Sequence, residues 1–273
     1  MALNFVLFLM ASGFGIVKFN FYKYVFSLLL LENIGVTFDH TIQGGWFVSV
    51  LFFVSLFYFY IFKYFDKKYY NFYIPILVIL GYTYMVHGTN GAIGAQLQII
   101  GEVFNGGVIQ GISAMGLGFL IHEFYRYLKT QNYIETLKSK IIYTLLEGYL
   151  LGFVVYETIM HKIHFKNLLI LVIAFCGLFI TFLLQRGYIS KILNNKISGI
   201  LGRYAYSLFL THGFVIILFN YFYVKKNTDI LFNHPYEILG IAIILALIFA
   251  VLVYHLVEVP AGKWLKKKFF PAE

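Results

Sequence analysis

The sequence predicts an all-α fold: a polytopic membrane protein with eight to nine transmembrane helices, forming a single domain over residues 1–273. Three observations predict it. Hydrophobic residues make up 60% of the chain, charged residues make up only 12%, and the mean hydropathy is +0.79. Soluble domains average about 45–50% apolar and about 25% charged residues. A soluble fold of this size could not bury so much apolar surface, so lipid must be its solvent.

Nine apolar runs are candidate spans, because about 20 residues are needed to cross the hydrocarbon core. In order, they are approximately Ala2–Val17, Phe21–Phe38, Trp46–Phe62, Phe72–Val86, Gly107–Tyr127, Ile141–Met160, Leu168–Leu184, Tyr204–Phe222 and Ile238–Leu256. The first run is short, and Lys23 and Glu32 interrupt the second. If the second run lies flat in the membrane interface, eight spans are left.

The distribution of positive charge tests this count, since cytoplasmic loops are enriched in Lys and Arg. With nine spans and the N-terminus outside, 17 of the 21 Lys and Arg residues fall on the inner side. The eight-span alternative places 15 inside. Both versions put the C-terminus in the cytoplasm. The net charge of +9 is therefore interpreted as a topology signal and not as a nucleic-acid footprint.

Ionisable residues inside a span are costly and become candidate functional residues. The candidates are Glu147, Glu157, His212, His255 with Glu258, and His122 with Glu123. Each also has a structural interpretation. His212 can be a packing residue, Glu147 an interhelical hydrogen-bond partner, and Glu258 a cap at the membrane boundary. His161 and His164 lack further ligands nearby, so no metal site is predicted.

Several segments together resemble a known family. Residues 201–215 read LGRYAYSLFLTHGFV, and residues 254–265 read YHLVEVPAGKWL. Weaker matches are the span at 46–63, the small-residue span at 107–120, where Gln110 stands in place of a frequent Arg, and Ser12–Phe14. In order and spacing they resemble the acyltransferase-three type of membrane acyltransferase, whose members O-acylate bacterial surface carbohydrates.

The resemblance implies transfer of an acyl group, by expectation acetyl, from acyl-CoA (acetyl-CoA) to a polysaccharide, lipopolysaccharide or lipid-linked glycan. It implies O-acetylation at the bacterial inner membrane, with membrane lipid around the protein, no bound cofactor and no nucleic acid. His212 takes the position of the family's His in the late span. Glu258 and Pro260 take its Glu-x-Pro ending. His212 is expected to act as the catalytic base, followed by Glu258.

One departure concerns the family's first span, which carries an Arg and a catalytic His. Residues 1–11 contain neither, so the chain is expected to be N-terminally incomplete. Two alternatives stay open. The first is a transporter or flippase of lipid-linked sugars, in which a carboxylate inside an apolar span, such as Glu147, could take part in transport. The second is an inactive, truncated member of the family.

The ending of the last span predicts local structure as well. Pro260 lacks a backbone N–H, so the helix is expected to end there. Glu258 is expected to pair with a basic residue such as Arg203. In the alternative, the basic tail that ends in Lys266–Lys268 binds anionic headgroups or the phosphates of CoA.

Overall fold

The computed structural model describes residues 22, 25–26, 29–31, 45–88, 99–100, 104–131, 136–160, 168–219, 221 and 235–269. The candidate span Ala2–Val17 and the segment Ser12–Phe14 lie outside the described residues, and Phe21–Phe38 lies largely outside them. His161 and His164 also fall outside.

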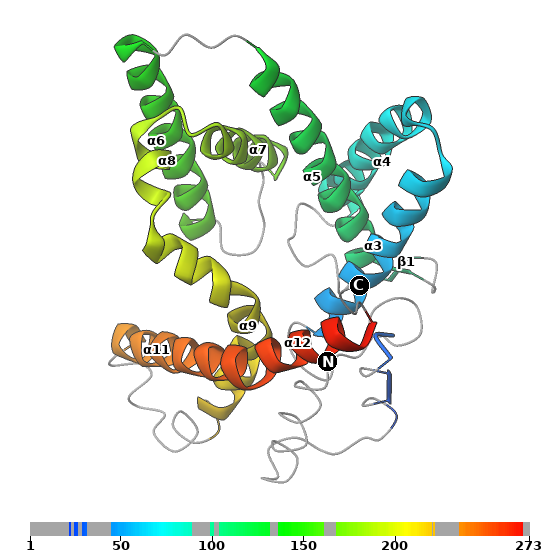
Figure 1. Cartoon of the computed structure of the whole chain (residues 1–273), viewed down its shortest axis with the longest axis vertical. Helices are drawn as coiled ribbons and strands as arrows, with labels where there is room; N and C mark the ends of the chain where they lie inside the picture. The colour runs from blue at the N-terminus through cyan, green and yellow to red at the C-terminus, as the bar shows by residue number, and fades with distance from the viewer. Residues whose placement is uncertain are drawn as a thin grey trace. The chain divides into compact units, whose positions relative to one another are not determined.

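The described structure is helical, which confirms the predicted class. Its helices are α3 (Gly45–Tyr64), α4 (Lys67–Gly88), α5 (Gly106–Thr130), α6 (Leu137–Met160), α7 (Leu168–Leu184), α8 (Tyr188–Leu193), α9 (Lys196–Phe219), α11 (Pro235–Val253), the π-helical turn η3 (Tyr254–Glu258) and α12 (Val259–Phe269) (Figure 1). A minimal antiparallel ladder joins β1 (Ile99–Ile100) to β2 (Phe104–Asn105). The sequence analysis did not predict this ladder.

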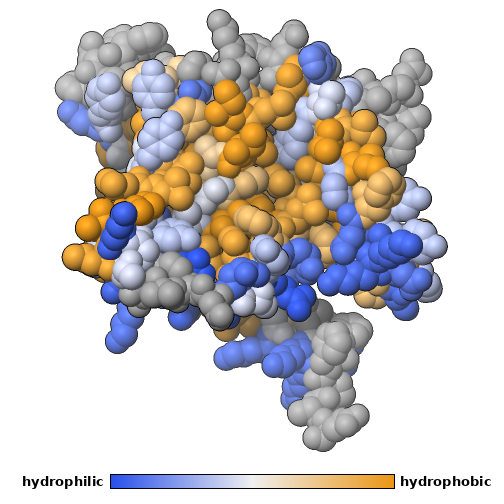
Figure 2. Space-filling model, turned by 90° about the horizontal axis from the view of Figure 1, so that it is seen from above, coloured by the Kyte–Doolittle hydropathy of each residue, from blue (hydrophilic) through white to orange (hydrophobic). Residues whose placement is uncertain are grey.

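Five helical segments in the described part are long and apolar enough to cross a membrane. They are Phe47–Tyr64, Gly106–Thr130, Leu137–Met160, Lys196–Leu218 and Tyr236–Lys268. The shorter apolar helix Leu168–Leu184 has 17 residues. Apolar side chains also cover much of the face shown in Figure 2. The chain is thus a multi-pass membrane protein, and the count of eight to nine spans stays a prediction.

The chain divides into two compact units. Unit 2 contains α3 from Ser49 onward and α4 to α8, whereas unit 1 contains α9, α11, η3 and α12 together with the first residues of α3. Within unit 2, small residues let the helices approach closely. A side chain at Gly116 of α5 would meet the Tyr58 hydroxyl and Val78. The Tyr58 hydroxyl donates a hydrogen bond to the Ile112 carbonyl at 2.7 Å.

Unit 2 gathers its basic loops at one end. Lys67, at the start of α4, contacts Glu123 near the end of α5 at 3.3 Å. Arg186, just after α7, donates to the Leu128 carbonyl at 3.4 Å. An apolar cluster containing Met85, Val154 and Leu168 packs the opposite ends of α4, α6 and α7. The loops that the charge bias assigned to one side of the membrane therefore lie at the same end of this unit.

In unit 1 the last helix does not end at Pro260, so that prediction is wrong. Helical backbone continues through α12 to Phe269, with Pro260 as its second residue. The reason is the π-helical turn before it, in which the Val259 N–H bonds to the Tyr254 carbonyl, five residues back. Pro is tolerated at the start of a new α-helical stretch, because an N–H donor is not needed there.

Candidate active site

His212 lies on α9 with its imidazole half-buried. Its Nδ1 is 2.6 Å from the carbonyl oxygen of Phe209, one turn earlier in the same helix. A carbonyl oxygen only accepts hydrogen bonds, so this contact requires the proton to be on Nδ1. In the neutral ring, Nε2 then carries the lone pair. The geometry therefore selects the tautomer in which Nε2 can accept a proton.

The imidazole of His212 lines an apolar cavity of about 470 Å³ between α9 and α11. The other walls come from side chains such as Phe209, Ile216, Leu239 and Ala246. Small-molecule sites are commonly mostly apolar cavities of about 300–1,000 Å³ with a few polar groups. Here His212 supplies the polar group, so the cavity suits an apolar or thioester-linked group that presents one polar atom to an imidazole.

Glu258 lies on η3 and contacts α9 through Ser207. The Ser207 hydroxyl donates a 2.5 Å hydrogen bond to the Glu258 carboxylate, and Ser207 is fully buried. Beside it, the Tyr204 hydroxyl lies 3.1 Å from Nε2 of His255. We call these four residues the α9–η3 clasp. Among the described residues, the Glu258 carboxylate contacts Ser207 and not Arg203, which lies one turn earlier on α9. The expected partner was therefore wrong. The expected contact between two helices through Glu258 is nevertheless present.

The two predicted catalytic residues do not come together in the described structure. Ser207, which holds Glu258, precedes His212 by five residues, or about 7.5 Å along the helix and about 140° around it. The clasp and the cavity therefore occupy different faces of α9. The sequence analysis did not single out Tyr204 or Ser207, although both stand in the segment 201–215 that contains His212 and are three residues apart, on one face of the helix.

Glu147 is fully buried on α6, and its carboxylate is hydrogen-bonded to the backbone. Its two oxygens accept hydrogen bonds from the backbone N–H groups of Gly187 and Ser190 at 3.2 and 3.1 Å. Gly187 is the N-cap of α8, and Ser190 lies in its first turn. Glu147 thus serves as a cap for a neighbouring helix, in agreement with its structural interpretation. Glu157, on the same helix, is also buried.

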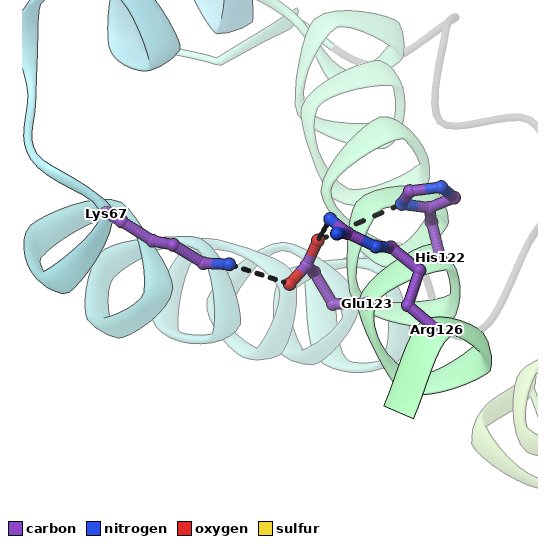
Figure 3. Close-up of polar contacts among 4 residues, drawn as sticks. All are labelled: Lys67, His122, Glu123 and Arg126. Carbon is purple, nitrogen blue, oxygen red and sulfur yellow. Dashed lines mark hydrogen bonds and ion pairs between the residues drawn. The ribbon is translucent and has the colours of Figure 1, made fainter. Parts of the chain in front are cut away.

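His122 and Glu123 lie near the end of α5, where Glu123 forms ion pairs with Lys67 and Arg126, each at 3.3 Å (Figure 3). His122 Nδ1 is 3.9 Å from the same carboxylate. Among the described residues no group of three or more His, Cys, Asp or Glu side chains has the arrangement of a metal site.

Comparison with models of known protein families identifies the family of the chain. The family model described as "Acyltransferase domain", of the acyltransferase-three type, matches residues 2–255. The chain belongs to this acyltransferase family. The match includes His212 and ends three residues before Glu258. No curated protein and no solved structure matches the chain. Family membership together with the apolar helices supports acyl transfer at a membrane, between an acyl donor and an acceptor, as the broad activity of this acyltransferase.

Proposed function

We propose that this acyltransferase moves an acyl group, by expectation acetyl, from acyl-CoA to a hydroxyl of a cell-surface or lipid-linked glycan such as lipopolysaccharide. The proposed location is the bacterial inner membrane. The observation that carries the proposal is His212: its Nδ1 is committed to the Phe209 carbonyl, and its ring lines an apolar cavity.

The proposed reaction assigns one role to each atom. Nε2 of His212 accepts the proton of the sugar hydroxyl while the hydroxyl oxygen attacks the thioester carbonyl. The carbon–sulfur bond then breaks, and the leaving thiolate of CoA takes the proton back from the imidazolium. The Phe209 carbonyl holds the ring in one orientation and stabilises the Nδ1–H throughout.

Glu258 can act in this reaction either as a positioning residue or as a catalytic residue. In the clasp it is a positioning residue, because its carboxylate joins η3 to α9 through Ser207. We favour this role. If Glu258→Gln accumulates and melts normally in detergent yet loses all transfer, Glu258 belongs among the catalytic residues instead.

The transporter alternative loses its main sequence argument in the structure. A coupling carboxylate must exchange protons or ions with a pathway, whereas both oxygens of Glu147 are bonded to backbone N–H groups of the α7–α8 junction. This arrangement favours the enzyme over the transporter.

The test uses membranes from cells that express the whole chain, incubated with acetyl-CoA. The readouts are release of free CoA and base-labile acetate in the glycan fraction. We expect His212→Ala to lower both by about 10²–10⁴-fold, the usual contribution of a general base. His87→Ala is the matched control, since His87 is an exposed imidazole at the end of α4.

The experiment tests the role of His212 and the acyl transfer itself separately. Wild-type product levels in His212→Ala would reduce His212 to a packing residue. Absence of CoA release and glycan acetate with the unmodified chain, tested with several acyl-CoA donors, would overturn the proposed transfer itself.

A further inference from the structure

Two pockets in unit 2 share His122 as a wall residue, and neither takes part in the proposed acyl transfer. The first, the apolar slot, has a volume of about 480 Å³ and is lined by α5, α7 and Tyr82 of α4. The second, the basic pocket, has a volume of about 590 Å³ and lies at the end of α5. One continuous ligand touching His122 could therefore place an apolar part in the slot and a polar part in the basic pocket.

The basic pocket carries a net positive charge. Lys67, Arg126 and Lys129 line it together with one carboxylate, Glu123. That carboxylate is paired with both Lys67 and Arg126, as Figure 3 shows. The Lys67 and Arg126 side chains nevertheless stay 60% and 63% exposed. Donors are therefore left over for an anion, and the charge of the pocket fits a phosphate.

The apolar slot has the direction and length of a lipid acyl chain. Along α5 it reaches from Ala114 to His122, which is about 12 Å at 1.5 Å per residue. One leaflet supplies about 15 Å of hydrocarbon, half of a core about 30 Å thick. Midway, a methyl group at Gly118 would meet nothing within 4 Å. Tyr125 and Tyr127, beside the basic pocket, are residues typical of the headgroup level.

We propose that the slot and the basic pocket together bind one anionic phospholipid of the surrounding bilayer. Arg126 and Lys129 bind its phosphate, and one acyl chain fills the slot past Gly118 to Ala114. A phospholipid fits because the slot begins at a helix end, where headgroups lie, and extends inward by about the depth of one leaflet. The binding does not depend on acyl transfer.

The single cysteine of the chain, Cys176, reports on the slot directly, because it is one of its wall residues. The whole chain is reconstituted in nanodiscs of phosphatidylcholine with or without phosphatidylglycerol, and the rate of Cys176 alkylation by N-ethylmaleimide is measured. Retained phosphatidylglycerol is counted by native mass spectrometry. We expect phosphatidylglycerol to slow the alkylation and to be retained at one molecule per chain.

Two variants with matched controls test the two halves of the site. Arg126→Gln with Lys129→Gln should weaken phosphatidylglycerol binding by about 25-fold, because each of the two cations near anionic lipid contributes roughly a factor of five. Lys68→Gln with Lys138→Gln removes the same charge from exposed positions outside the basic pocket. Gly118→Leu should abolish retention by filling the slot. Gly152→Leu is its control, since that glycine of α6 is exposed and also faces open space.

Loss of retention in Arg126→Gln/Lys129→Gln and in Gly118→Leu, with both controls unchanged, supports the proposal. Equal protection of Cys176 by phosphatidylcholine alone would overturn it, because the headgroup charge would then play no part. Protection by palmitoyl-CoA but not by phosphatidylglycerol would also overturn it and would assign the site to an acyl donor.

Discussion

At the residue scale, the junction between α7 and α8 shows what a fully buried carboxylate does in this protein. The helix α8 has only six residues, and its N-cap, Gly187, has no side chain to cap it. Its first N–H groups are satisfied from α6 instead. Thr144 accepts a hydrogen bond from the Tyr188 N–H at 2.9 Å, and Glu147 accepts two more. A negative charge at the start of a helix is also favourable to the helix dipole.

This arrangement depends on Gly187 having no side chain. A Cβ at that position would overlap the Glu147 carboxylate. We expect Gly187→Ala to lower the free energy of unfolding by about 1–3 kcal/mol, the range for overpacking a buried site. The measurement is thermal unfolding of the purified protein in detergent.

The control for this experiment is Gly152→Ala, at a position where the added methyl group meets nothing within 4 Å. It should melt at or slightly above the wild-type temperature, because Ala favours a helix over Gly. If Gly187→Ala melts together with Gly152→Ala, then Glu147 does not cap α8 in the way the structure shows.

At the scale of elements, the π-helical turn η3 explains how a helix passes Pro260 and why Glu258 faces α9. The wider turn moves the hydrogen-bond register by one residue just before the proline. It also carries His255 and Glu258, which contact Tyr204 and Ser207 respectively. The clasp and the turn therefore depend on the same few residues.

We predict that Ser207→Ala weakens this clasp. A buried hydrogen bond to a charged group contributes about 1.5–3 kcal/mol, and the substitution would leave the Glu258 carboxylate without its donor. The melting temperature in detergent should fall by several degrees. Ser55→Ala is the control. Among the described residues, the Ser55 hydroxyl donates to the Leu51 carbonyl of its own helix and makes one long contact with the sulfur of Met115. Equal melting of the two variants would show that the clasp contributes nothing to stability.

At the scale of the whole molecule, the distribution of charge predicts orientation. The basic loops of unit 2 lie at one end, with contacts from Lys67 to Glu123 and from Arg186 to Leu128. The positive-inside rule places that end in the cytoplasm. The same rule places the basic tail that ends in Lys266–Lys268 there as well.

Reporter fusions test this orientation in cells. A fusion after Lys268 should report the cytoplasm, whereas one inserted between residues 225 and 233 should report the outside. The lysine-rich loops dictate this result, because translocating them across the membrane is disfavoured. An outside signal from the Lys268 fusion would reverse the whole orientation.

Composition and order of residues determined the class of this protein without any structure. A chain with 60% hydrophobic and 12% charged residues must dissolve in lipid. Its long, continuous apolar runs then predict helices, which satisfy their backbone groups internally. The order of motifs around His212 indicated the family, which the match over residues 2–255 confirms. These conclusions depend on local patterns, which a sequence displays directly.

Only the tertiary structure decided which polar side chains meet. Lys67 and Glu123 are 56 residues apart, and Glu147 and Gly187 are 40 apart. Nothing in either segment alone indicates its partner, because the contact depends on which helices pack together and how far each is rotated about its axis. For the same reason the sequence analysis expected Glu258 to pair with a basic residue such as Arg203. The rotation of α9 and the π-helical turn instead bring the Glu258 carboxylate to Ser207.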